Sequence, residues 1–174
     1  MSQPTGFRRS QRAVRHAATV FATAFIGCAN GDNDTLRPLV DQIGPAVAAV
    51  EAELGGPQRY FEINVTPQFV NVFVAIDDDA QVQAYLYVDG DLGPPRPPEA
   101  ASGATFTASA LTFDPDTVLD GVDDDLPDSD VVVFSVIGGP DGVVRYGAVV
   151  ESTEGGQLDV TLSPTGAVQS VDPL

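Results

Sequence analysis

The sequence predicts an α+β fold in which two pseudo-repeats, each a helix followed by an antiparallel β-meander, pack into one globular unit. Three observations support this prediction. An apolar stripe at helical spacing occupies residues 35–54, and alternating apolar and polar residues continue from there to residue 88. The same order of patterns returns after residue 105, where residues 132–134 correspond to residues 61–63.

The first element is a helix, because apolar residues recur every three or four positions and form one stripe, which is typical of a helix that covers a core. The stripe consists of Leu36, Leu39, Val40, Ile43, Val47, Val50 and Leu54. Asp34 or Thr35 can cap its start, and the Gly-Gly-Pro sequence at 55–57 ends it. Pro45 removes one backbone hydrogen bond, so we expect a kink or two short helices.

Three strands follow, at residues 60–66, 69–76 and 81–88, because each segment alternates apolar and polar side chains. Short polar links join them, which predicts an antiparallel meander with one face on the helix. In the third strand, the residues assigned to the core are Val82, Ala84, Leu86 and Val88. This assignment turns Tyr85 and Tyr87 outward as candidate protein contacts, and the alternative is that a helix or the other half covers them.

The segment at 93–104 contains four prolines within five positions and predicts an extended linker. Beyond it, Val118, Leu119, Val122 and Leu126 give one apolar side to a predicted short helix at 116–125. The predicted strands of the second half lie at 130–137, 143–151, 157–163 and 167–171, with Gly and Pro at their boundaries.

The N-terminus has the layout of an export signal. Arg8, Arg9, Arg12 and Arg15 precede an apolar run at 17–26, which is too short to span a membrane, and Cys28 follows Gly27. The sequence Phe-Ile-Gly-Cys at 25–28 resembles the lipobox of prokaryotic lipoproteins, which implies cleavage before Cys28 and lipid attachment to its sulfur. The alternative is an ordinary secretory signal. The expected organisation is a signal peptide at 1–27, a tether at 28–34, repeats at 35–92 and 105–174, and a linker at 93–104.

The tandem helix-plus-meander pattern resembles PepSY-like domains and the architecture of β-lactamase inhibitor proteins. The closest local match is at 158–171, Leu-Asp-Val-Thr-Leu-Ser-Pro-Thr-Gly-Ala-Val-Gln-Ser-Val, which looks like the strand-turn-strand ending of a PepSY-like unit. The resemblance implies a fold and a tendency toward protein binding or inhibition. It transfers no functional residues.

Charge excludes several classes of function. All 25 acidic residues follow Cys28, and only four arginines accompany them, at positions 37, 59, 96 and 145. Such a chain repels phosphate, so we expect no nucleic-acid partner and no attachment to a membrane through a polybasic patch.

Catalytic chemistry is restricted by the residues that are missing. After His16 and Cys28 there is no further histidine or cysteine, and the chain has no lysine. Catalytic sites built on His, Cys or Lys, and zinc or haem sites, are therefore excluded from the mature chain. We expect no enzyme activity, no cofactor and no metal site, and we interpret the acidic runs at 77–79 and 123–125 as solvated turns.

These observations together predict an exported, lipid-anchored, non-catalytic binding module of the cell envelope. Its expected partner is another protein or an envelope component, and its expected location is extracytoplasmic at the cell membrane, or secreted if Cys28 carries no lipid. Two alternatives remain open at the level of the sequence. One is a structural envelope protein, and the other is a hydrolase that depends on carboxylates alone.

Overall fold

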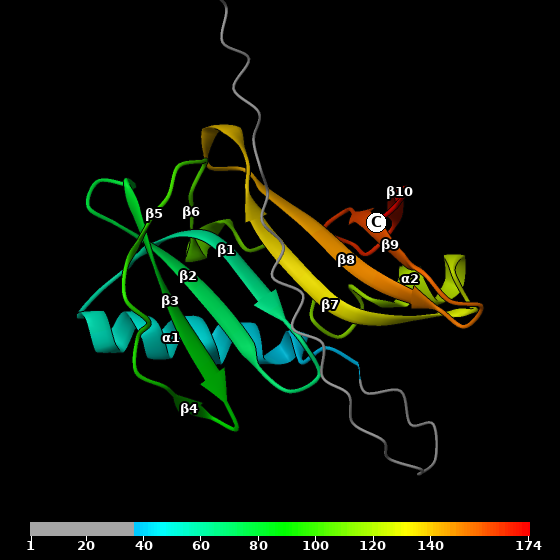
Figure 1. Cartoon of the computed structure of the whole chain (residues 1–174), viewed down its shortest axis with the longest axis horizontal. Coiled ribbons are helices and arrows are strands. Elements are labelled where there is room, and N and C mark those ends of the chain that lie inside the picture. Colours follow the sequence, from blue (N-terminus) through cyan, green and yellow to red (C-terminus); the bar gives the residue numbers. More distant parts are fainter. Residues whose placement is uncertain (1–36) are drawn as a thin grey trace, which may run out of the picture. The chain divides into compact units, whose positions relative to one another are not determined.

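The computed structural model describes residues 37–174, which belong to one compact unit built on a ten-stranded antiparallel sheet (Figure 1). The predicted signal peptide, the tether and Cys28 lie outside the described residues. Within the sheet the strand order is β10-β9-β8-β7-β1-β2-β3-β4, while β5 pairs with β3 and β6 pairs with β1.

The strands have the following bounds: β1 Arg59–Val65, β2 Val70–Ile76, β3 Gln81–Val88, β4 Asp91–Leu92, β5 Glu99–Ala100, β6 Phe106–Thr107, β7 Ser129–Gly138, β8 Val144–Ser152, β9 Gln157–Leu162 and β10 Val168–Pro173. The seven strands expected from alternation are confirmed with small shifts at their ends. The short strands β4, β5 and β6 were not predicted.

The long helical segment begins with a 3-10 turn at Val40–Gln42, which runs into α1 at Ile43–Leu54. Pro45 is the third residue of α1 and lies in its first turn, where backbone N–H groups have no partner within the helix. The proline is therefore tolerated, and α1 continues through it as one helix. Gly55 ends α1 in the left-handed conformation, with φ of 79°.

The predicted fold class is wrong. The second predicted helix is reduced to α2 at Asp120–Asp125, so the protein is mainly a single antiparallel sheet rather than two helix-plus-meander repeats. Poor helix formers explain the short α2, because it contains Gly121 and four aspartates. Three of those aspartates, at 123–125, lie at the C-terminal end of α2, where negative charge opposes the helix dipole. Two further 3-10 turns lie at Ala108–Ala110 and Pro140–Gly142.

The proline-rich segment at 93–104 is not a spacer, because its first part runs along the outer edge of β3. The backbone N–H groups of Gly93, Arg96 and Ala101 donate to the carbonyls of Leu86, Ala84 and Ala80, at 2.8, 2.9 and 3.0 Å. The prolines between them have no N–H to offer to a further strand. This segment therefore closes one edge of the sheet, as proline does at many exposed edges.

The core lies between the sheet and the helices, and the buried residues of both halves form one cluster. Ile43, Ala46 and Val50 of α1 are buried against this face. Toward the second half, the ring of Phe113 lies 5.5 Å from the rings of both Phe134 and Tyr146. Figure 1 shows α1 crossing behind β2 and β3, so the helix covers one face of this part of the sheet.

The orientation expected for β3 is wrong. Tyr85 is 2% exposed and Tyr87 is 8% exposed, so neither tyrosine is an exposed protein contact. The register explains this result, because Tyr85 pairs with Val72 and Tyr87 pairs with Val70, and cross-strand partners share a face. Since both valines are fully buried, the two tyrosines also face the helix.

We expect the double substitution Tyr85→Ser/Tyr87→Ser to destabilise the protein strongly, because it leaves cavities under α1. Loss of a large buried aromatic side chain costs about 3–5 kcal/mol at each site. Chemical denaturation of the purified protein measures the loss. The matched control, Tyr85→Phe/Tyr87→Phe, removes only hydroxyl groups and should cost about 1 kcal/mol per hydrogen bond lost. A melting temperature unchanged by the serine pair would contradict this placement.

Candidate binding surface

One face of the sheet lies opposite the core, and we call it the open face. Its apolar side chains are partly exposed, and none of them belongs to the core cluster or packs against it. They are Phe73, Val82, Ala84, Leu86 and Val88 from β2 and β3, and Val133, Ile137 and Val149 from β7 and β8. In Figure 1 the viewed side of β1–β3 carries no helix.

The register makes these residues neighbours across several strands. Ala84 pairs with Phe73, Phe73 pairs with Glu62, and Glu62 pairs with Ile137. Directly paired side chains on one face have Cβ atoms about 5 Å apart. These four residues form a row across β3, β2, β1 and β7, which we call the apolar row, and the Glu62 carboxyl on β1 lies between Phe73 and Ile137.

Glu62 lies at the centre of this row. Burial by its neighbours raises the pKa of the Glu62 carboxyl above its ordinary value, and a hydrogen bond from Asn64 lowers the pKa in part. The hydroxyl of Ser135 on β7 donates to Oδ1 of Asn64 at 2.8 Å, which fixes the Asn64 side chain. Partial burial removes water that would otherwise solvate the charged Glu62 carboxylate. The surroundings therefore disfavour the charged form relative to the neutral form.

The far half of the open face carries two pairs of carboxylates. Asp130 on β7 lies opposite Glu151 on β8, and Asp159 on β9 lies opposite Asp172 on β10. All four residues are exposed, and none of their side chains takes part in an ion pair or side-chain hydrogen bond within residues 37–174. Like charges placed directly opposite each other destabilise a sheet. The two acidic pairs therefore weaken the fold rather than support it.

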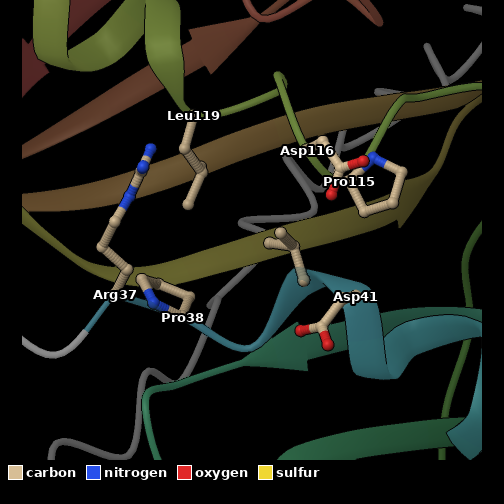
Figure 2. A pocket seen from close by; sticks show the side chains of 7 residues that line it. Arg37, Pro38, Asp41, Pro115, Asp116 and Leu119 are labelled. Atoms are coloured by element: carbon tan, nitrogen blue, oxygen red, sulfur yellow. The ribbon is translucent and has the colours of Figure 1, made fainter.

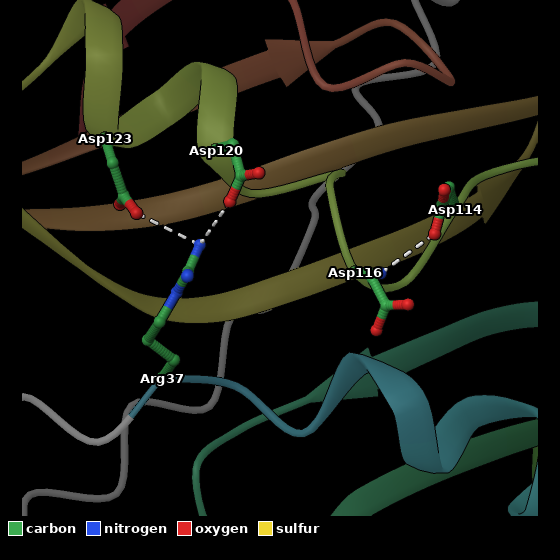
Figure 3. A network of polar contacts seen from close by, with 5 residues as sticks. All are labelled: Arg37, Asp114, Asp116, Asp120 and Asp123. Atoms are coloured by element: carbon green, nitrogen blue, oxygen red, sulfur yellow. Dashed lines mark hydrogen bonds and ion pairs between the residues drawn. The ribbon is translucent and has the colours of Figure 1, made fainter.

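A shallow pocket of about 230 Å³ lies where the chain approaches α1 and is lined by Arg37, Pro38, Val40, Asp41, Pro115, Asp116 and Leu119 (Figure 2). The Arg37 side chain extends toward α2, where its guanidinium lies 3.4 Å from Oδ1 of Asp120 and 3.0 Å from Oδ2 of Asp123 (Figure 3). The carboxylate of Asp41 accepts a hydrogen bond from Gln42 at 2.7 Å. Only the two ion pairs of Arg37 connect the start of the described chain with α2, and exposed ion pairs of this kind contribute little to stability.

A second hollow of about 340 Å³ is lined by Leu39, Gln42, Val70, Tyr87, Asp89 and Gly90. It contains one carboxylate, from Asp89, so a pair of carboxylates for acid and base catalysis does not meet there. In the described part of the chain, no three acidic, histidine or cysteine side chains are grouped closely enough to hold a metal ion. No helix among residues 37–174 is long and apolar enough to cross a membrane.

Comparison with known proteins gave no match to a protein-family model, to a curated protein or to a solved structure. The resemblance to PepSY-like domains therefore stays a prediction. Of the residues singled out in the sequence, Tyr85 and Tyr87 are in the core and Cys28 lies outside the described residues.

Sequence reasoning missed the open face, although a signal for it was present. Residues 81–88 alternate two sets that both suit burial, one aliphatic and one containing the tyrosines, and only the pairing with β2 decides between them. Each acidic pair joins two consecutive strands, and only the register between the strands determines which residues lie opposite each other, so no local pattern marks the pairs.

We expect Glu62→Gln to stabilise the protein at neutral pH. Because the pKa of Glu62 is raised in the folded state, its carboxyl contributes stability at pH values below the pKa of glutamate in the unfolded chain, which is about 4.3. This contribution is lost as the pH rises through the folded-state pKa of Glu62. The unfolding free energy of Glu62→Gln minus that of the original protein should therefore grow with pH above about 4.3 and then level off. Urea denaturation across this range measures the difference. A flat difference for Glu62→Gln across this pH range would contradict the expectation.

Proposed function

We propose that the protein is an exported, lipid-anchored, non-catalytic binding module that contacts another component of the cell envelope through the open face of its sheet. The observation that carries this proposal is the set of partly exposed apolar side chains on that face, from Leu86 and Phe73 on one side to Val149 on the other, all outside the core cluster. A polar row that contains Asn71, Asn64 and Ser135 divides these side chains into two areas, and exposed apolar patches rimmed by polar residues mark interaction sites.

The residues available for chemistry support a binding role. The mature chain expected from the sequence lacks histidine and lysine and has Cys28 as its only cysteine, so few groups can exchange protons near neutral pH. Its carboxylates are abundant, but the larger of the two hollows described above is lined by a single one, from Asp89. Shape and surface charge are then the properties that the protein offers to a partner.

The location rests on the N-terminal sequence. Four arginines before a short apolar run, followed by Gly27 and Cys28, favour export and lipid attachment. A lipid on Cys28, together with a tether ahead of the folded unit, would keep the protein at the membrane surface while the sheet remains accessible.

We expect Cys28→Ser to release the protein from the membrane fraction of its native host, because serine offers no sulfur for lipid attachment. Fractionation with metabolic labelling by a radioactive fatty acid measures both effects. A conservative exchange in the same region, Ala29→Ser, is the control and should keep label and location. Retention of the label in Cys28→Ser would contradict lipid attachment at this residue.

We expect a photo-cross-linking amino acid at Phe73 to capture a partner in intact cells, because this position lies in the middle of the apolar row. The control position is Leu54, which is 38% exposed at the end of α1, on the helix side of the sheet. Mass spectrometry of cross-linked bands identifies the partner. Capture from position 54 alone, or from neither position, would contradict the open face as the contact surface.

A further inference from the structure

We propose that the partner of the open face is a cationic protein segment that carries Lys or Arg together with apolar side chains. This inference rests on the proposed function and adds the chemical class of the partner. It is carried by the two acidic pairs, Asp130 with Glu151 and Asp159 with Asp172, and by their position beside Val133 and Val149 of the open face.

The acidic pairs adjoin the apolar surface directly. Val133 pairs with Val149, Val149 pairs with Asp159, and Asp159 pairs with Asp172, so one line of paired residues passes from apolar side chains to carboxylates. A segment that covered this line would bury its apolar groups on the valines and place its charged groups against the carboxylates. The complementary charge is positive.

No positive charge of the described chain neutralises these pairs. Arg59 pairs with Asp79, and Arg37 pairs with Asp120 and Asp123 on the helix side. Arg145 lies on the open face but opposite Ile137, at the other end of β8 from Glu151. A cationic segment would therefore remove an uncompensated repulsion within the sheet.

The charge of the whole chain favours the same class of partner. The formal net charge of −17 attracts cationic proteins over distances of about 10 Å at moderate salt and repels anionic lipid headgroups and nucleic acids. Among envelope components, this leaves a basic protein surface as the complementary partner. A membrane surface of anionic lipid is the opposite case and serves as an outcome of the test.

The test measures binding of a short synthetic peptide of lysine and leucine to the purified protein by isothermal titration calorimetry. A peptide with glutamate in place of lysine is the charge-reversed comparison, and vesicles of phosphatidylglycerol test an anionic membrane. The variant Asp159→Asn/Asp172→Asn removes one acidic pair. The matched control, Asp78→Asn/Asp89→Asn, removes the same charge from two exposed turns, where asparagine also accepts the positive φ of 53° and 52°.

We expect the lysine peptide to bind and the glutamate peptide and the vesicles not to bind. The pair variant should weaken binding by roughly tenfold or more, and the control by less than about twofold, because only the first change removes charge at the contact. Raising the salt concentration from about 50 mM to about 500 mM should weaken binding to the original protein as well. Thermal unfolding verifies that both variants fold.

Absence of binding by the lysine peptide, equal weakening by both variants, binding of the glutamate peptide, or binding of the vesicles would overturn the cationic class of partner. None of these results affects the cross-links expected from position 73, so the proposed function would stand. Absence of any cross-link from position 73 would instead contradict the proposed function, and the inference about the partner would then be wrong as well.

Discussion

The pairing of β1 with β7 is the interaction on which the rest of the structure depends. Ile63 pairs with Val136 and Val65 pairs with Phe134, and all four side chains are buried. Without this pairing each half would be a small meander with one unpaired inner edge, and a unit of that size buries too little apolar surface to be stable alone. With it, the cores of both halves merge into one cluster, and the sheet is wide enough for a single face to bear both apolar and acidic surface.

Close backbone contacts hold the second half in this arrangement. A side chain on Gly138 at the end of β7 would meet the carbonyl of Ala104 at 2.2 Å, and one on Gly121 in α2 would meet the carbonyl of Gly166 at the same distance. Glycine is required at both places because the backbones touch.

In the first half, a side-chain hydrogen bond joins β1 to α1. The hydroxyl of Tyr60 donates to Oε1 of Glu51 at 3.0 Å, and burial together with that carboxylate raises the pKa of Tyr60.

The sequence was sufficient for local structure and insufficient for the choices that involve two segments. Alternation located the strands, because β-branched residues at every second position leave few other options. It did not determine which side of β3 faces the helix, since Tyr85 is placed inside by its pairing with Val72. The proline-rich segment was predicted as a linker because proline favours an extended backbone, but three of its N–H groups bind it to β3 and to Ala80 just before β3. The candidate surface was missed for the same reason, since its acidic pairs join residues that only the register brings together.

The two ends of the sheet differ in what they can accept. Within residues 37–174, prolines at positions 94, 95, 97 and 98 leave few donors beyond β3 at one end, while at the other end β10 pairs only with β9. Growth by strand addition is thus possible from a single edge. If two molecules paired through their β10 strands, each would lose the edge strand that is open for pairing. Association through β10 would therefore stop at a symmetric dimer and would not continue into a fibre.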